Sequence, residues 1–483
     1  MNRRMVLYTL GHISVANAAL LTLPMVVSLI YGEFCSMLAF LISAGISIVL
    51  GLLLRFTARP GTKVIYAKEG FAIVSYAWLL MAAIGALPFV IEGAIPSYFD
   101  AFFETVSGFT TTGASILSGE SITSMSHGLL FWRSFTHWIG GMGVLVFVMA
   151  IIPNISDRSI HIMRAEMPGP EVGKLLPKAR DTAKILYLIY IVMTAVEIIL
   201  LLCGGMPFFD SVVHSFGTAG TGGFGIKPDS IGSYSPYLQW VIAIFMLIFG
   251  INFNLFYLIL IRKFSHVFRN SELWCYLGIV GISVCIITAN IFSMYNGLEE
   301  SLRMSAFQVA SIISTTGYAT TDFNMWPQLS KSILLILMFT GACAGSTAGG
   351  LKMSRVVLLG KSIFRELKKM LHPRSVKVVK VDGKRVDEQV LASTTSYFAV
   401  YMLCVLGIFV LLSIEPFSME TNFSATVACF NNIGPGLAGV GPAANYGAYS
   451  DFSKVLLSLA MLLGRLEIFP LILGLNPLVW KKK

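Results

Sequence analysis

The chain has 483 residues, of which 55% are hydrophobic and only 12% are charged. Soluble proteins carry about a quarter charged residues, so this composition excludes an ordinary soluble domain. Long apolar runs recur along the chain, and a helix needs about 20 apolar residues to cross roughly 30 Å of hydrocarbon. The sequence therefore predicts an all-α polytopic membrane protein.

The net charge of +10 is distributed unevenly between alternate loops. Of the 35 Lys and Arg residues, 29 lie near the two termini and in the segments 55–68, 154–184, 262–269 and 352–385. The opposite loops hold few basic residues and are rich in acids such as Glu120 and Glu299. This asymmetry follows the positive-inside rule, so we expect both termini and the large basic loops to face the cytoplasm. Nothing in this charge separately supports nucleic-acid binding.

The chain begins with two apolar segments, near 8–30 and 36–54, that have no glycine motif between them. The first follows two arginines and could imitate a signal peptide. It is long and lacks a good small-residue cleavage site, so we expect it to be retained as a helix. These segments predict an N-terminal transmembrane hairpin, 1–66.

Four units follow, each with two long apolar segments that flank a short amphipathic run and a glycine turn. We expect pore repeats at 67–153, 184–270, 271–360 and 390–483, with basic cytoplasmic linkers at 154–183 and 361–389. The predicted helices lie near 70–92, 98–109 and 128–152 in repeat one, 184–203, 209–218 and 235–261 in repeat two, 272–293, 302–313 and 329–360 in repeat three, and 390–413, 420–430 and 453–479 in repeat four.

The four glycine turns read FTTTGA at 109–114, GTGGF at 220–224, STTGY at 314–318 and NNIGP at 431–435. The short helices before them cannot span a bilayer, and each would point its negative carboxyl end at the membrane centre, which favours a cation there. Irregular backbone at that depth needs protein or a water-filled cavity around it. A single turn of this kind is typical of an ordinary loop. Four copies instead predict four pseudo-symmetric repeats around one central pore.

A ring of backbone carbonyl oxygens can replace the hydration shell of an ion, as in potassium channel filters. Glycine permits the positive φ angles that such a ladder needs. No carboxylate lies in the turns, which favours a monovalent ion such as K⁺ over Ca²⁺. The second turn departs from the Thr-rich pattern. The predicted K⁺ filter residues are Thr111, Thr112, Gly113, Thr221, Gly222, Gly223, Thr315, Thr316, Gly317, Asn432, Ile433 and Gly434.

The return helix of repeat three is interrupted by small residues at 341–350. Such a stretch holds a helix weakly, and its backbone must be satisfied by protein or water. Gly345 to Gly350 reads GxxxxG, but Lys352 stands one residue too late for a phosphate loop and no strand is predicted before it. Close helix packing is one alternative. The favoured interpretation is a flexible gate under the filter that includes Gly345, Gly349, Gly350 and Lys352.

Two further charged or titratable residues stand out within apolar segments. Arg465 is predicted in the middle of the last helix, where a charge is costly and faces a cavity or a partner. A salt bridge to Glu467 is not expected, because residues two apart point away from each other on a helix. His214, in the second short helix, is expected to be a packing residue rather than a proton carrier.

The seven cysteines form no CxxC pair and are expected to be small buried hydrophobes.

The sequence resembles the TrkH/TrkG/KtrB family of potassium uptake proteins. Besides the four turns, the resemblance rests on RAEMPGP at 164–170, CAGSTAGGLK at 343–352, NNIGPGL at 431–437 and GRLEIF at 464–469. It covers nearly the whole chain, including the N-terminal hairpin that TrkH-type members have and KtrB-type members lack. In related plant transporters, a serine at the first filter glycine goes with Na⁺ transport, so Gly113 implies K⁺ here.

The resemblance implies a gated K⁺ pore in the bacterial inner membrane. Arg465 then lines the ion path and limits passage, and the 341–350 loop blocks ions. The implied partners are membrane lipid, a second copy of the chain in a homodimer, and a TrkA-like cytoplasmic ring that binds nucleotide. The chain has no dinucleotide fingerprint of its own, so we expect no nucleotide to bind it. K⁺ is then the transported ion rather than a resident cofactor.

Two other functions compete with a gated pore. Broken helices also occur in coupled carriers, so a K⁺/H⁺ symporter is the alternative, although no carboxylate network is evident at mid-membrane. A membrane enzyme has less support, because the sequence shows no paired carboxylates, metal-ligand spacing or nucleophile–base set at a shared depth.

Overall fold

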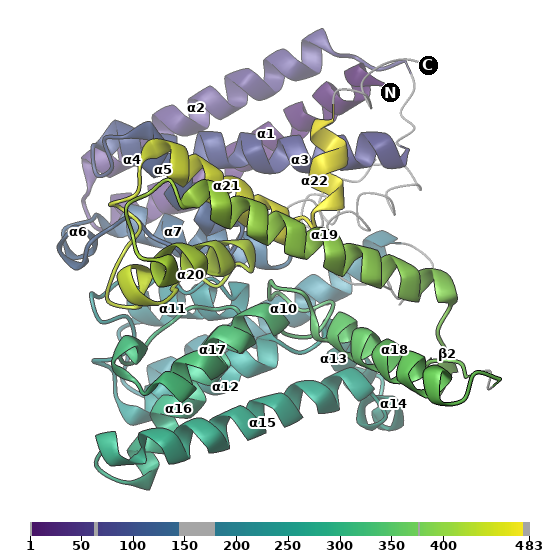
Figure 1. Cartoon of the computed structure of the whole chain (residues 1–483). Coiled ribbons are helices and arrows are strands. Elements are labelled where there is room, and N and C mark those ends of the chain that lie inside the picture. Colours follow the sequence, from purple (N-terminus) through teal and green to yellow (C-terminus); the bar gives the residue numbers. More distant parts are fainter. Residues whose placement is uncertain (1, 62–65, 144–178, 375–376, 477–483) are drawn as a thin grey trace.

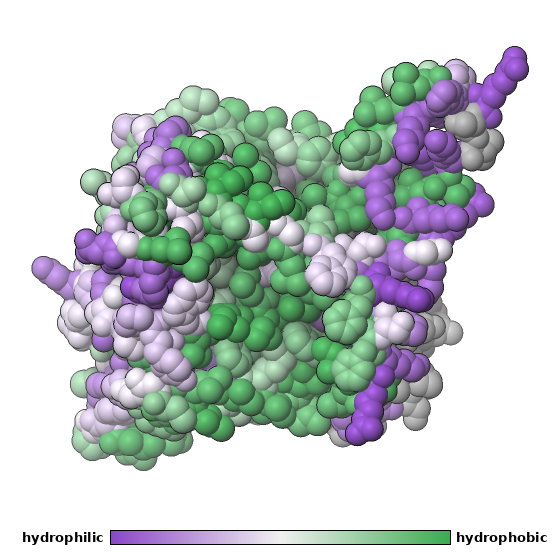
Figure 2. Space-filling model, turned by 90° about the horizontal axis from the view of Figure 1, so that it is seen from below, coloured by the Kyte–Doolittle hydropathy of each residue, from purple (hydrophilic) through white to green (hydrophobic). Residues whose placement is uncertain are grey.

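The computed structural model of the chain describes residues 2–61, 66–143, 179–374 and 377–476. This part of the chain is mostly helical, and its helices run roughly side by side (Figure 1). Six of its helices are long and apolar enough to cross a membrane, and eight spans result if each of two bent helix pairs counts as one. An apolar band lies between two polar ends of the molecule (Figure 2). The protein is a multi-pass membrane protein.

The predicted N-terminal hairpin is present as α1 (Arg3–Ile30) and α2 (Phe34–Thr57). Small residues let the two helices approach closely, as is typical of helices within a bilayer. The hydroxyls of Ser14 and Ser47 each donate to the other residue's carbonyl over 2.8 Å. A β-carbon added at Gly51 would lie 2.8 Å from the Gly11 carbonyl. The hairpin packs against α3 (Ala67–Gly85) and α7 (His127–Gly141) of the following unit.

The same order of a long helix, a short helix, a turn and a return helix occurs four times after the hairpin. The four short helices begin and end close to the predicted positions, and the first and fourth are capped by Ser97 and Ser418. The units are α3 (Ala67–Gly85), α4 (Leu87–Glu92), α5 (Tyr98–Phe109), α6 (Gly119–Thr123) and α7 (His127–Gly141) in the first; α10 (Ala179–Cys203), α11 (Phe208–Gly220), α12 (Pro236–Phe249), α13 (Phe253–Leu260) and α14 (Phe264–Phe268) in the second; α15 (Ser271–Ile291), η1 (Phe292–Met294), α16 (Leu298–Ile313), η2 (Phe323–Met325), α17 (Gln328–Thr340) and α18 (Met353–Leu371) in the third; and α19 (Glu388–Leu412), α20 (Met419–Phe430), η3 (Ala438–Val440), α21 (Asp451–Arg465) and α22 (Phe469–Leu475) in the fourth.

The return helices are less regular than predicted. The helix expected over 235–261 is two helices, α12 and α13, with a 91° bend between them. Asn252 caps α13, since its side chain accepts from the Asn254 amide over 2.9 Å. The carbonyl of Gly250 accepts from the Cys343 amide over 3.0 Å, and the Phe253 amide donates to the Gly345 carbonyl over 3.1 Å. The break is stable because the 341–352 loop pairs with the backbone groups that it frees.

The last helix also differs from the prediction of one helix over 453–479. It bends by 119° between α21 and α22, where Glu467 and Ile468 both have positive φ angles, of 54° and 57°. The next helix, α22, then begins at Phe469, with Pro470 in its first turn, where its missing amide hydrogen costs no helical hydrogen bond. Arg465 is therefore the last residue of α21, not the middle of a helix. In the first unit, the helix predicted over 128–152 is wrong at its centre: α7 ends at Gly141, and Met142 and Gly143, which has a φ of 81°, are not helical, while residues 144–152 lie outside the described residues.

The predicted interruption in the third return helix is confirmed, since α17 ends at Thr340 and α18 begins at Met353. The helix after it runs to Leu371, beyond the predicted end at 360. A short antiparallel pair follows, β1 (Lys380–Val381) and β2 (Lys384–Arg385). The last turn of α18 carries two basic residues, Lys368 and Lys369. Figure 1 places this end of α18 on the same side of the molecule as the start of α1.

Candidate functional site

The four turns have the same backbone conformation. In each, a residue that is not glycine takes a left-handed φ of 56–57°, and a glycine two positions later takes a φ of 71–95°. The first set is Thr111, Thr221, Thr315 and Asn432, and the second set is Gly113, Gly223, Gly317 and Gly434. Left-handed conformations are costly for residues with a β-carbon, so their recurrence at four matching positions shows that the surrounding structure imposes them.

Hydrogen bonds at the end of each short helix explain this conformation. The amides of Thr112, Gly222, Thr316 and Ile433 donate to carbonyls five residues earlier, over 2.8–2.9 Å. This is the closure of a Schellman motif, which ends a helix with a residue in the left-handed region. Each short helix thus stops at the same point, and the chain after it turns away.

The four turns meet around one axis. A β-carbon added at Gly113 would lie 1.8 Å from the carbonyl oxygen of Gly222 in the second turn. The same holds around the ring. A β-carbon at Gly223 would lie 2.0 Å from the Thr316 carbonyl oxygen of the third turn, and one at Gly317 would lie 2.1 Å from the Ile433 carbonyl oxygen of the fourth. A β-carbon at Gly434 would lie 2.6 Å from the Thr112 carbonyl oxygen of the first turn. Each turn thus touches the next, and the fourth touches the first. The contacts form a closed ring.

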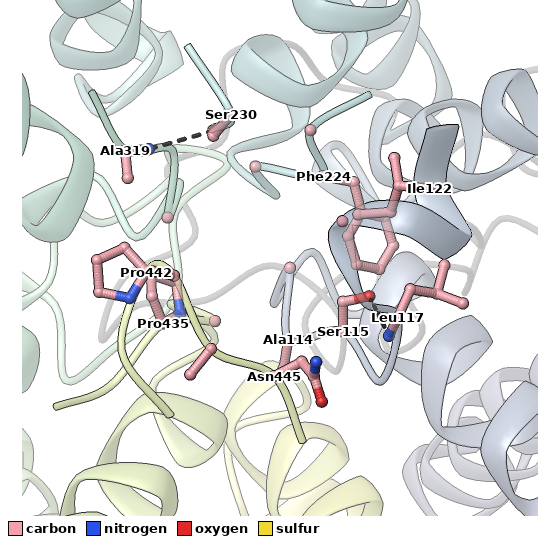
Figure 3. A pocket seen from close by; sticks show the side chains of 18 of the residues that line it. Ala114, Ser115, Leu117, Ile122, Phe224, Ser230, Ala319, Pro435, Pro442 and Asn445 are labelled. Carbon is pink, nitrogen blue, oxygen red and sulfur yellow. Dashed lines mark hydrogen bonds between the residues drawn. The ribbon is translucent and has the colours of Figure 1, made fainter. Parts of the chain in front are cut away.

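A cavity of about 210 Å³ opens on one side of this ring. All four turn glycines line it, together with residues that follow them in the chain. Figure 3 shows Ala114, Phe224, Ala319 and Pro435, the residues after or near these glycines, around the opening. Among the described residues, no acidic side chain lines the cavity, so charge on carboxylates does not define this entrance.

Every predicted filter residue lies in this ring of turns. The side chains of the seven that are not glycine are fully buried, at 0% exposure. Hydroxyl and amide groups brace the first, third and fourth turns from behind: Thr110 Oγ1 lies 2.8 Å from Thr112 Oγ1, Ser314 Oγ lies 2.7 Å from Thr316 Oγ1, and Asn432 Nδ2 donates to Thr112 Oγ1 over 3.0 Å. The binding of an ion by these residues remains a prediction.

An ion pair behind the ring joins the first two units. Arg133 Nη2 lies 2.8 Å from Glu104 Oε1, and both side chains are almost fully buried. Glu104 also accepts from the Ser115 hydroxyl over 2.9 Å and from the Ile116 amide over 3.0 Å. Arg133 Nη1 donates to the Gly225 carbonyl in the second unit over 3.2 Å. The pair therefore fixes the chain that leaves the first turn against the chain that leaves the second.

Replacing Glu104 by Gln is expected to lower the free energy of unfolding by about 3–5 kcal/mol, because it leaves a buried guanidinium without its counter-charge. Thermal unfolding of the purified protein in detergent measures the loss. The matched control is Glu299→Gln, since Glu299 pairs with Arg303 but its side chain is 64% exposed. An exposed pair contributes about 0–1 kcal/mol. Equal losses in the two variants would contradict a stabilising role for the buried pair.

The loop at 341–352 lies directly against the third and fourth turns. The Gly349 amide donates to Thr315 Oγ1 over 2.7 Å. A β-carbon at Gly349 would lie 2.5 Å from the Asn431 carbonyl and 2.9 Å from the β-carbon of Asn432. The GxxxxG stretch in this loop follows a helix, α17, and not a strand, which argues against a phosphate loop. Of the predicted gate glycines, Gly349 and Gly350 therefore lie next to the ring, whereas Gly345 lies against Asn252.

Charged side chains hold the loop in place. Arg465 Nη1 donates to the Thr347 carbonyl over 2.7 Å, and Nη2 donates to the carbonyls of Gly140 and Gly141 over 2.5 and 2.8 Å. Lys352 is buried and donates through Nζ to the Ala348 carbonyl. Arg465 thus connects the loop, the end of α21 and the negative end of α7.

Glu467 lies just beyond the end of α21 and forms an ion pair with Arg355. Its Oε2 lies 2.7 Å from Arg355 Nη2 on α18. This ion pair connects the bend between α21 and α22 to the helix that follows the loop. The two charged residues near the end of α21 therefore act on two separate elements.

Sequence reasoning missed two buried carboxylates. Glu272, at the start of α15, accepts through Oε1 from the amides of Ala344 and Ser354, over 2.6 and 2.9 Å, and so anchors both ends of the loop. Glu197, on α10, is fully buried where α10 packs against α11, and no ion pair involves it within the described ranges. The sequence did offer a signal for both residues, since each is an isolated acidic residue in or beside an apolar segment.

His214 lies in a hydrogen-bonded packing site. Its Nε2 is 3.2 Å from the Tyr234 hydroxyl and its Nδ1 is 3.3 Å from the Tyr318 hydroxyl. Tyr318 directly follows Gly317, so the histidine connects the second short helix to the third turn. This agrees with the packing role expected for it.

Comparisons with known proteins agree on one family. The chain matches the TrkH family model, which describes a cation transport protein, over residues 37–478. It is 35% identical to the Trk system potassium uptake protein TrkH of Salmonella typhimurium, over 100% of both chains. It is 34% identical to the Trk system potassium uptake protein TrkG of Escherichia coli, over 95% of this chain and 94% of that protein. The crystal structure of the potassium transporter TrkH from Vibrio parahaemolyticus matches with a TM-score of 0.89 and 30% identity, with both chains fully covered.

Proposed function

Because the chain belongs to the TrkH family of cation transport proteins, we propose that it is the K⁺-translocating subunit of a Trk-type potassium uptake system. The observation that carries this proposal is the closed ring of four turns. In that ring, the carbonyls of Thr112, Gly222, Thr316 and Ile433 each contact the glycine of a neighbouring turn. An ion on the axis would exchange water for main-chain oxygens from four directions.

The chemistry of the ring favours K⁺. Carbonyl dipoles suit a monovalent cation that gives up its hydration shell readily. Ca²⁺ and Mg²⁺ prefer carboxylates or retained water, and in the part of the chain that the structure describes no acidic residue lines the adjacent cavity. The carboxyl ends of the four short helices add negative partial charge from behind the ring.

Growth of a bacterium that lacks its own K⁺ uptake systems tests the proposal. Expression of the protein, together with its regulatory partner, should restore growth at low external K⁺. Growth that needs high K⁺ in spite of correct insertion of the protein into the membrane would contradict it.

In this proposal the 341–352 loop is the gate. It contacts the third and fourth turns from the side that leads to α18, and its small residues occupy the space under the ring. Arg465 holds the loop through the Thr347 carbonyl and also places a positive charge beside the path. Both effects oppose the passage of a cation.

Replacing Arg465 by Ala is expected to raise ⁸⁶Rb⁺ uptake about tenfold, since lowering a barrier by about 1.4 kcal/mol raises a rate tenfold. Uptake by the purified protein in lipid vesicles measures the change. Arg365→Ala is the control, because this arginine on α18 pairs with Glu366 and Glu388 away from the ring. Unchanged uptake by a correctly folded Arg465→Ala variant would remove the barrier role.

The proposed setting is the bacterial inner membrane, with both termini in the cytoplasm. The distribution of Lys and Arg residues supports this orientation. The basic end of α18, with Lys368 and Lys369, offers a surface for a TrkA-like cytoplasmic ring that binds nucleotide. The proposed assembly is a homodimer, and its nucleotide is bound by the partner.

Glu197 favours one alternative function, a K⁺/H⁺ symporter. A buried carboxylate within a membrane helix is typical of proton pathways, and Glu197 has no ion-pair partner in the residues that the structure describes. A symporter would acidify vesicles as Rb⁺ enters, which a pH-sensitive dye reports, and Glu197→Gln would abolish that signal. A pore would show Rb⁺ entry without coupled acidification and no loss in this variant.

A further inference from the structure

The geometry points to His137 as a positioning residue of the second turn. We propose that its imidazole ring occupies the volume that a side chain at position 222 would need, and so fixes the Gly222 carbonyl in the ring. This inference rests on the proposed function, because it explains how the turn that departs from the Thr-rich pattern keeps its place in a K⁺ filter.

The second turn has less side-chain bracing than the first and third: Thr221 Oγ1 donates to the Gly220 carbonyl over 2.6 Å, but no side-chain hydrogen bond forms at position 222. The residues that supply the ring carbonyls are Thr112, Thr316 and Ile433 in three turns, and Gly222 in the second. The two threonines are hydrogen-bonded to neighbouring hydroxyl or amide groups. The Gly222 amide donates to the Gly217 carbonyl within the turn, but Gly222 has no side chain that could hold its own carbonyl, which leaves that role to a residue outside the turn.

His137, on α7 of the first unit, stands where that side chain would be. A β-carbon added at Gly222 would lie 2.2 Å from both Cγ and Nδ1 of the His137 ring. Gly222 does not have a left-handed φ, so its backbone conformation by itself allows a side chain. The ring of His137 is therefore what restricts position 222 to glycine.

The His137 ring is itself held firmly. It is fully buried, and its Nδ1 donates to the Gly108 carbonyl over 2.8 Å, which fixes the orientation of the ring. The backbone of α7 is equally close, since a β-carbon at Gly220 would lie 2.3 Å from the His137 carbonyl oxygen. The imidazole ring is therefore held in one orientation beside Gly222.

A second side chain of α7 holds the residues that follow. The centre of the Phe224 ring is 4.3 Å from that of His137, and the Arg133 guanidinium lies 4.2 Å from the Phe224 ring centre. Arg133 and His137 are one helical turn apart, so they share a face of α7. Phe224, which Figure 3 places at the rim of the cavity, is packed between them. The first unit thus supplies the rigidity that the second turn lacks.

The test is a double-mutant cycle between positions 137 and 222, read as the ratio of ⁸⁶Rb⁺ to ²²Na⁺ flux in vesicles. His137→Ala and Gly222→Thr are each expected to lower this ratio about fivefold or more, since contacting residues couple strongly. The first substitution leaves the turn loose, and the second makes a clash. The double variant H137A/G222T is expected to recover to within about twofold of the wild type, because the threonine enters the space that the ring leaves.

Two further variants separate positioning from general structure. His137→Gln retains a donor toward the Gly108 carbonyl and should keep more selectivity than His137→Ala. His266→Ala, which removes an exposed histidine on α14, should change nothing. If Gly222→Thr does not fold, the comparison of His137→Ala with H137A/G222T carries the test, since adding the threonine must then raise the flux ratio.

Losses that simply multiply in the double variant, or a His137→Ala protein with wild-type selectivity, would overturn this inference. A wild-type protein that shows no preference for Rb⁺ over Na⁺ would instead defeat the proposed function. The two failures are therefore distinguishable in the same set of flux measurements.

Discussion

Replacing Gly113 by Ser is expected to lower the ratio of K⁺ to Na⁺ flux about tenfold or more, a change of about 1.4 kcal/mol in relative barrier height. The added β-carbon would lie 1.8 Å from the Gly222 carbonyl oxygen, and the φ of 78° at this position is unfavourable for any side chain. The turns must move apart to make room, and the ring then no longer matches an ion of one size. Flux of ⁸⁶Rb⁺ and ²²Na⁺ into vesicles measures the ratio.

The matched control is Gly407→Ser on α19, where an added β-carbon meets nothing within 4 Å and the φ is ordinary. This variant should retain wild-type selectivity. A Gly113→Ser protein that folds and still discriminates as well as the wild type would show that the ring of carbonyls does not set ion preference.

Deleting residues 345–349 is expected to give high ⁸⁶Rb⁺ uptake in the absence of any cytoplasmic partner. The deletion removes the contact of Gly349 with Thr315 and the carbonyl of Thr347 that Arg465 holds. The space below the third and fourth turns would then be open. Uptake by the purified variant in vesicles, compared with the wild type without partner, measures the effect.

Ion selectivity is the internal control for this deletion, because the four turns are unchanged. The variant should conduct faster while keeping the wild-type ratio of Rb⁺ to Na⁺ flux. A folded deletion variant that remains closed would place the gate elsewhere in the molecule.

The order of helices could be predicted from the sequence because it depends on local signals. The length of the apolar segments predicted the long helices, and the turns rich in hydroxyl residues and glycine indicated where each short helix ends. The short helices at 98–109 and 420–430 were placed within one residue of α5 and α20. The small residues at 341–350 likewise predicted the break between α17 and α18.

The bends in α12–α13 and α21–α22 could not be predicted in this way. The bend at Gly250 depends on hydrogen bonds to Cys343 and Gly345, which are far away in the chain. The partners of Arg465 could not be predicted either, because Gly140 and Thr347 belong to two other units and are far away in the chain. Local propensity does not report contacts that only the folded chain creates.

The second turn shows this limit within the candidate site. Its glycines appeared as a departure from a Thr-rich pattern, with no visible compensation. In the structure, His137 from the preceding unit fills the space beside Gly222. The side chain that fills this space comes from another repeat, so residues 220–224 alone could not have identified it.

Competition for ⁸⁶Rb⁺ uptake by the purified protein in lipid vesicles tests the central claim most directly. If four turns form one carbonyl ring sized for K⁺, unlabelled K⁺ and Rb⁺ should compete with the tracer at similar concentrations, while Na⁺ and Li⁺ should compete far less. Uptake should follow the Rb⁺ gradient. Equal competition by Na⁺, or no uptake of the tracer by a folded and correctly inserted protein, would contradict the account.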